Sequence, residues 1–189
     1  MTINITSNAN RNPSLVYSVV AANNNVPPVC TYGDFFKQRL WLIDAALTNR
    51  LWYSVQEGTI YDVEKFPSLN YVDFSFRILS IFSLGAHLYV NTDGGLIRQP
   101  YGDPTLAYEY VDQRYHFTAV ETLCYNQGYI IGITNDGIRV FDGSGFSGDI
   151  SAKIKNIYDT IVASIALGYV SAVIVRKKLR TEYRLCYYD

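Results

Sequence analysis

The sequence predicts an all-β protein: a β-propeller-like array of antiparallel three- to four-stranded blades, with an extended N-terminal arm and one short helix. Two observations carry this expectation. Val, Ile, Thr, Phe, Tyr and Trp make up 73 of the 189 residues, and β-branched and aromatic residues are enriched in strands. After residue 28, apolar runs alternate with turn signals at a repeat of about 40–45 residues, which is typical of propeller blades.

The chain is expected to have two parts, an arm over residues 1–28 and a β domain of about four repeats over residues 29–189. The arm is rich in asparagine, contains a strand candidate from Leu15 to Val20 and ends at Pro27-Pro28, which favours a stiff extended turn. A disordered tail is the alternative. We expect the arm strand to dock on the last blade of its own chain or to add to a neighbour, and we favour the neighbour.

Turn glycines mark the repeats. Gly85, Gly128 and Gly168 lie 43 and then 40 residues apart, and each is predicted to join two strands, with a third strand after a tight turn. The expected strands are 78–84, 87–92 and 95–99; then 119–125, 129–134 and 137–142; then 161–167, 169–175 and 182–187. A looser first copy has strands at 39–44 and 50–55.

The tight turns carry the residues that hairpins need. Asp93-Gly94 and Asp136-Gly137 each stand between two apolar runs, and Asp and Gly tolerate the positive φ of such turns. The run Ile130-Ile131 does not alternate with polar residues. This is expected if a blade buries both faces of its sheet against its neighbours.

One stretch breaks the strand pattern. Isoleucines recur there at helical spacing, which predicts a short amphipathic helix over residues 150–159, crossing between blades. These isoleucines are Ile150, Ile154, Ile157 and Ile161.

Composition excludes several classes of protein. Hydrophobic residues are 49% and charged residues 17% of the chain, which excludes disorder as the main state. A net charge of −1 provides no global field for nucleic acid or an anionic membrane. The N-terminus lacks the features of a secretory signal. The longest apolar run, 161–175, has 15 residues, fewer than the roughly 20 that span a bilayer, so we expect a soluble protein without a membrane partner.

The glycine-rich segment Gly143 to Gly148 formally matches the dinucleotide-binding pattern Gly-x-Gly-x-x-Gly. Asp142 and Asp149 flank it, however, and would repel a pyrophosphate at a helix start. A calcium loop is the other alternative, but two carboxylates are fewer than an EF-hand uses. We therefore expect a mobile loop, with no cofactor and no metal ion bound.

Catalytic motifs are not evident in the sequence. Neither His87 nor His116 has a cysteine or aspartate at a motif spacing, and no serine lies in a Gly-x-Ser-x-Gly elbow. A triad could still assemble in space, since triads are defined by geometry. Cys30, Cys124 and Cys186 are odd in number and far apart, which argues against a disulfide framework and a structural zinc site. We expect a protein that is not an enzyme.

A basic segment near the end of the sequence is the one candidate binding site. Five basic residues fall within nine positions: Arg176, Lys177, Lys178, Arg180 and Arg184. Basic side chains interleaved with aromatic ones can bind phosphate backbones, although the same composition suits a solvated hairpin turn. Weak contact with DNA, or contact with an acidic protein neighbour, is therefore the functional alternative to a plain turn.

Two longer segments resemble a known family. They are Arg39-Leu-Trp-Leu-Ile-Asp44 with Asn49-Arg-Leu-Trp-Tyr-Ser-Val-Gln-Glu-Gly58 and Phe66-Pro67, and Tyr129-Ile-Ile-Gly-Ile-Thr-Asn-Asp-Gly-Ile-Arg-Val-Phe-Asp-Gly143. They resemble the propeller-like structural proteins of tailed bacteriophages in the neck and tail tube, including the packaged-DNA stabilisation proteins that plug the portal. The resemblance covers roughly residues 33–160. Members of this family are usually much longer, and a closed single-chain propeller needs at least about four blades.

The resemblance implies a structural virion protein of the neck or tail, assembled in the host cytoplasm and acting through portal, neck or tail-ring proteins and copies of itself. It implies no catalytic residues. The alternative is a small propeller lectin that stacks glycans on aromatic pockets. Such a lectin would have near-identical pockets in each repeat, yet the residue after the turn glycine is Ala86, Tyr129 and Tyr169 in turn.

Overall fold

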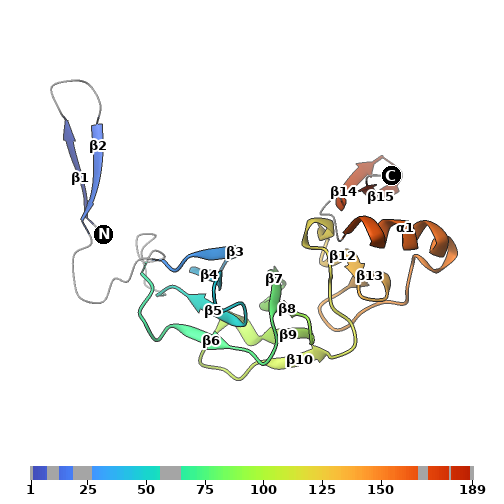
Figure 1. Cartoon of the computed structure of the whole chain (residues 1–189), viewed down its shortest axis with the longest axis horizontal. Helices are drawn as coiled ribbons and strands as arrows, with labels where there is room; N and C mark the ends of the chain where they lie inside the picture. The colour runs from blue at the N-terminus through green and yellow to red at the C-terminus, as the bar shows by residue number, and fades with distance from the viewer. Residues whose placement is uncertain are drawn as a thin grey trace. The chain divides into compact units, whose positions relative to one another are not determined.

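The computed structural model describes residues 2–7, 13–18, 27–55, 65–165, 170–178 and 180–187 (Figure 1). The chain divides into two compact units, Met1–Phe74 and Ser75–Asp189, and each is described by itself. Strands make up 51% of the described structure, every sheet is antiparallel, and the described residues include one short α-helix. The predicted all-β class is confirmed at this level. No sheet within the described residues closes on itself.

The first unit contains a hairpin and a four-stranded sheet. The hairpin pairs β1 (Thr2–Ser7) with β2 (Pro13–Ser18). The sheet is a meander in chain order, made of β3 (Cys30–Phe36), β4 (Arg39–Asp44), β5 (Arg50–Tyr53) and β6 (Tyr71–Asp73). Among the described residues of this unit, the largest fully buried side chains are those of Trp41, Phe66, Ile43 and Leu51.

Predictions for the first unit are confirmed in part. The strands expected at 39–44 and 50–55 are β4 and β5, although β5 ends at Tyr53. The arm strand expected from Leu15 to Val20 overlaps β2, and positions 19–20 lie outside the described residues. This strand is paired with β1 in a hairpin, so the arm is not a single extended segment there. The arm boundary at residue 28 stays a prediction.

The second unit contains three sheets and helix α1, and most of their elements are labelled in Figure 1. Each sheet again follows chain order. The first has β7 (Ile78–Leu84), β8 (His87–Thr92), β9 (Gly95–Gln99) and β10 (Glu109–Asp112); the second has β11 (Cys124–Asn126), β12 (Tyr129–Thr134) and β13 (Gly137–Phe141); the third has β14 (Val170–Lys177) and β15 (Arg180–Tyr187). Helix α1 spans Lys155–Ile165, and 3₁₀ turns occupy Pro100–Gly102, Val120–Thr122 and Ala152–Ile154.

The tight turns of the first two sheets share one geometry. Thr92 pairs with Gly95 and Thr134 pairs with Gly137, with two residues between them in each turn. In both turns the threonine hydroxyl donates a hydrogen bond of 2.8 Å to the glycine carbonyl. The strand–turn–strand pattern predicted from the glycines is therefore confirmed in these two copies.

Three predicted elements are wrong in part. The strand expected at 161–167 is helical as far as Ile165, and residues 166–169, including the predicted turn glycine, lie outside the described residues. The helix expected at 150–159 correspondingly begins only at Lys155. The strand expected at 119–125 is mostly a 3₁₀ turn, and β11 begins at Cys124.

The helix begins later than predicted because its buried face includes only one of the expected isoleucines. Tyr158 and Ile161 are 8% and 2% exposed, and Ile165 is half-buried on the same core. Of the four isoleucines that suggested the earlier helix, only Ile161 is buried; the other three are exposed: Ile150, Ile154 and Ile157. Packing of Tyr158 and Ile161 against the β11–β13 sheet overrides the strand preference of the β-branched residues that follow.

The β11–β13 sheet is buried on both faces. On one side Ile130 packs with Phe82, Tyr89 and Phe141, which joins this sheet to the β7–β10 sheet. On the other side Ile131 belongs to a core that includes residues of α1, β14 and β15. The burial of both faces expected from the unbroken run Ile130-Ile131 is thereby confirmed, although α1 and the β14–β15 hairpin cover the second face. The second unit is a stack of three layers.

Asn91 joins the first two layers of this stack. Its side chain is fully buried on β8. The amide nitrogen donates to the Phe117 carbonyl at 2.8 Å and to Ser80 Oγ at 3.1 Å, and the amide oxygen accepts from the Phe117 N–H at 2.9 Å. The amide thus bonds to Phe117 as a neighbouring strand would. Phe117 in turn forms a β-bridge with Thr134 of β12.

Replacing Asn91 by alanine should destabilise the second unit. The N–H and C=O of Phe117 would be left buried without partners, and each such group costs about 1–3 kcal/mol. We expect a loss of about 2–4 kcal/mol in the free energy of unfolding, measured by urea denaturation. Asn156→Ala, on the exposed surface of α1, is the control and should change stability by less than about 0.5 kcal/mol. Equal losses in both variants would contradict this role of Asn91.

Candidate functional site

The predicted basic site lies on the β14–β15 hairpin. The register pairs Lys177 with Arg180, and Glu182 and Arg184 follow at alternate positions of β15. Side chains two residues apart on a strand point to the same face, so all four lie on one face of the hairpin. We call this the charged face.

Glu182 is the centre of the charged face. Its carboxylate lies 3.0 Å from Lys177 Nζ, 2.5 Å from Arg180 Nε and 2.6 Å from Arg184 Nη2. The hydrogen bond from Arg184, followed by that from Lys177, holds the pKa of Glu182 below its ordinary value. The three cations remain between 42% and 69% exposed. One carboxylate therefore arranges three positive groups, and the face keeps an excess of positive charge.

The other two predicted residues are placed elsewhere. Arg176 lies on the opposite face of the hairpin, where its guanidinium donates to Asn126 Oδ1 at 3.0 Å. Lys178 is exposed at the end of the hairpin. The structure therefore brings three of the five predicted residues together, and it adds Glu182, which was not among the residues expected from the sequence. The alternation Arg-x-Glu-x-Arg in β15 is the signal that could have identified it.

The opposite face anchors the hairpin. Ile174, Tyr183 and Leu185 pack against the core that contains Ile131 and Ile161. The Tyr183 hydroxyl donates to the Thr122 carbonyl at 2.9 Å, and burial raises the pKa of Tyr183 far above its ordinary value. One face of the hairpin is thus fixed to the body of the unit while the charged face is exposed.

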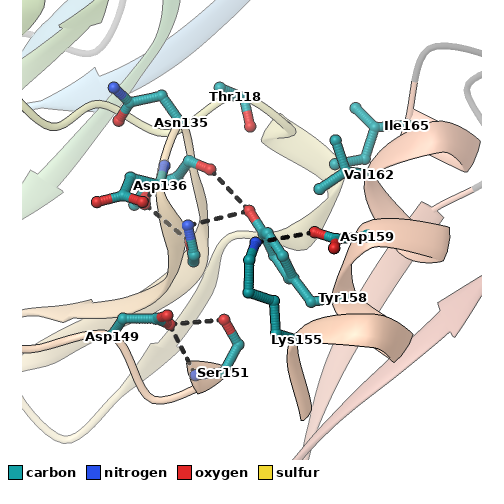
Figure 2. A pocket seen from close by; sticks show the side chains of 12 residues that line it. Thr118, Asn135, Asp136, Asp149, Ser151, Lys155, Tyr158, Asp159, Val162 and Ile165 are labelled. Carbon is teal, nitrogen blue, oxygen red and sulfur yellow. Dashed lines mark hydrogen bonds and ion pairs between the residues drawn. The ribbon is translucent and has the colours of Figure 1, made fainter. Parts of the chain in front are cut away.

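A cavity lies beside helix α1 (Figure 2). Its volume is about 570 Å³. The walls come from α1, from the turn between β12 and β13, and from the segment before the helix. The lining residues are Thr118, Thr134, Asn135, Asp136, Gly137, Asp149, Ser151, Lys155, Tyr158, Asp159, Val162 and Ile165.

Tyr158 is the buried aromatic side chain that lines this cavity. Its hydroxyl donates to the Thr134 carbonyl at 3.1 Å and accepts from the Gly137 N–H at 3.1 Å (Figure 2). Burial raises the pKa of this phenol. The helix is therefore attached to both ends of the β12–β13 turn through a single buried oxygen.

Asp149 and Ser151 hold the segment before the helix against β13. Asp149 Oδ1 accepts from the Ser151 N–H at 2.7 Å and from Ser151 Oγ at 2.6 Å. Ser151 Oγ in turn accepts from the Ile138 N–H at 3.2 Å. Burial raises the pKa of Asp149, but the hydrogen bonds from Ser151 and Ile138 and the charge of Arg139 outweigh this effect and hold it below its ordinary value.

Gly137 is required at this point. It has a φ of 97°, and a Cβ there would collide with the carboxylate of Asp149.

The other charged residues lining the cavity are paired with neighbours: Asp136 with Arg139 at 3.2 Å, and Lys155 with Asp159 at 3.1 Å. These hydrogen bonds and ion pairs are what is expected of a contact that attaches α1 to the β12–β13 turn. In the described ranges, no three His, Cys, Asp or Glu side chains form a group that could hold a metal ion.

The glycine-rich segment folds back on β13. Asp142 Oδ1 accepts from the N–H groups of Ser144 and Gly145 at 2.8 and 3.1 Å, and the Ser147 N–H donates to the Val140 carbonyl at 2.8 Å. Hydrogen bonds from Ser144 and Gly145 lower the pKa of Asp142. Six residues separate Gly148 from the start of α1, so this loop does not lead directly into a helix N-terminus, as the dinucleotide pattern requires.

The histidines lie at different turns of the second unit. His87 Nδ1 accepts from the Tyr101 N–H at 3.2 Å. The His116 N–H donates to Asn135 Oδ1 at 3.3 Å, and burial lowers the pKa of its imidazole. All three cysteines are free thiols, and Cys30 and Cys186 are exposed residues. Burial raises the pKa of the Cys124 thiol.

No known protein family and no curated protein matches this sequence. Within the part of the chain that the structure describes, no helix is long and apolar enough to cross a membrane. The resemblance to phage neck and tail proteins therefore stays a prediction based on the motifs quoted above.

Replacing Tyr158 by phenylalanine should loosen α1. The ring would stay in the core, but the Gly137 N–H and the Thr134 carbonyl would each lose one hydrogen-bond partner. We expect a loss of about 1–3 kcal/mol in the free energy of unfolding, measured by urea denaturation. Tyr125→Phe is the matched control, since Tyr125 is 59% exposed, and it should be close to neutral. An unchanged stability for Tyr158→Phe would show that its hydroxyl is not needed.

Replacing Asp149 by asparagine should reduce the sensitivity of the protein to acid. The pKa of Asp149 is lowered by folding, so its contribution to stability is complete above the ordinary carboxyl pKa and is lost as the pH falls through the folded value. We expect the melting temperature of the variant to fall less than that of the wild type between pH 5 and pH 3. Asn156→Ala, an exposed substitution on α1 that changes no ionisable group, should keep the wild-type profile. Identical profiles for all three proteins would contradict the assignment.

Proposed function

We propose that this protein is a structural component of a tailed-bacteriophage virion, located at the neck or tail. It acts by assembly, through copies of itself and through portal, neck or tail-ring proteins. It is made in the host cytoplasm and carried in the particle.

Within the all-β class, the packing of successive sheets supports a propeller-like arrangement. Each sheet is a meander in chain order, and in the second unit the β7–β10 and β11–β13 sheets pack face to face through Phe82, Tyr89 and Phe141. Neighbouring propeller blades pack in the same way. The segments that resemble the phage proteins coincide with β4, β5, β12 and β13.

The observation that carries the proposal is the β14–β15 hairpin. One of its faces is fixed to the core through Tyr183, while the charged face is exposed. Among the described residues, β15 pairs only with β14, so no described strand covers the outer edge of its eight residues. Long exposed edges invite pairing with other chains. Such a surface suits a protein that works inside an assembly.

Two other functions have less support. The glycan-binding alternative needs aromatic platforms, and the cavity beside α1 contains one aromatic side chain, Tyr158, whose hydroxyl is engaged by backbone groups. An enzyme needs a poised acid, base or nucleophile, and the charged residues of this cavity are bonded to their neighbours. Nucleic acid would be a secondary and weak partner, because Glu182 offsets part of the positive charge.

The proposal predicts that the protein is present in purified virions of the phage whose genome encodes it. Immunogold labelling of intact particles should place it at the neck or tail, and deletion of its gene should give heads that fail to mature into infectious tailed particles. Supplying the protein in trans should restore them. Virions that lack the protein, or a deletion without any effect on particle assembly, would overturn the proposal.

A further inference from the structure

We infer that β15 is a self-complementary edge through which two copies of this chain pair, antiparallel and centred on Tyr183. This interface goes beyond the virion proposal and does not depend on it, because it concerns the purified protein alone. The strand that pairs with the outer edge of β15 is, in this proposal, β15 of a second copy.

The two edges of the β14–β15 sheet differ. On the β14 side, the strand lies against β11 of the neighbouring sheet, and the Arg176 guanidinium donates to Asn126 Oδ1 there at 3.0 Å. On the β15 side no further strand lies among the described residues. β15 pairs with β14 along its whole length, which holds its outer N–H and C=O groups in line for another strand.

The charge pattern of β15 selects both the occupant and the register. Antiparallel pairing of two copies about Tyr183 sets Glu182 opposite the partner's Arg184, and the same contact recurs by symmetry. Moving the centre by one residue would instead place two Glu182 or two Arg184 side chains opposite each other. Like charges directly opposite are destabilising, whereas opposite charges stabilise a cross-strand pair.

The two faces of the hairpin agree with this register. Residues directly opposite in an antiparallel pair lie on the same face of the sheet. The charged face would therefore continue into the charged face of the partner, with Arg180 opposite the partner's Cys186. On the anchored face, Thr181 would lie opposite the partner's Leu185. Main-chain hydrogen bonds supply the affinity in such an interface, and the charge pairs fix the register.

A cysteine introduced at position 180 tests the register directly. Within one chain, positions 180 and 186 are about 20 Å apart on a strand, so a disulfide between them can form only between two copies. We expect Cys30→Ser/Arg180→Cys to give a covalent dimer on mild oxidation, and a reducing agent to reverse it. Cys30→Ser/Lys177→Cys is the matched control, since position 177 lies on the same face but on β14, and it should stay uncrosslinked. A crosslinked control together with an uncrosslinked Arg180→Cys variant would overturn the register.

Charge reversal tests the complementarity independently. Glu182→Arg and Arg184→Glu should each dissociate a wild-type dimer, because each places like charges opposite. Mixed together, the two variants should form a heterodimer, in which both cross-strand pairs are again opposite in sign. Sedimentation velocity at several concentrations measures the masses, and circular dichroism checks that each variant is folded. A wild-type protein that is monomeric at all concentrations, or two single variants that dimerise as the wild type does, would overturn the proposal.

Discussion

Burial of both faces of the β11–β13 sheet is the constraint on which the second unit depends. A sheet with Ile130 on one face and Ile131 on the other cannot be stable beside water on either side. The β7–β10 sheet covers the first face, and α1 with β14 and β15 covers the second. The helix therefore serves as a cover for a sheet, and the last hairpin is held in place by the same core.

Stacking layers in this way buries backbone N–H and C=O groups at each contact between two layers. Single side chains form hydrogen bonds with these groups. Asn91 bonds to the backbone of Phe117 at the first contact, while Tyr158 and Tyr183 bond to backbone groups at the second. Among the residues that the structure describes, no buried side-chain nitrogen or oxygen lacks a hydrogen-bond partner. Because its anchored face is fixed in this way, the β14–β15 hairpin can expose a charged face and an open edge without losing its place.

Local turn chemistry explains which strands were predictable. The turns at Thr92–Gly95 and Thr134–Gly137 contain Asp and Gly residues that indicate a hairpin. The turn between β3 and β4 contains neither Asp nor Gly. Lys37 and Gln38 form it instead, with φ values of 51° and 62°. Non-glycine residues rarely adopt such angles, and β3 therefore escaped prediction. The cluster around Glu182 was missed for a related reason: its members come from two strands, and only their register brings them together.

By itself the sequence determined the all-β class, the two hairpins around residues 85–95 and 128–137, and the double-sided burial of β12, since propensity, turn residues and apolar runs are local properties. Tertiary structure alone decided that 161–165 is helical and that Tyr158, not Ile154 or Ile157, faces the core. It also decided which basic residues meet on the charged face. The physical reason is that burial and cross-strand register are set by partners distant in the chain, and these can override the preference of any short segment.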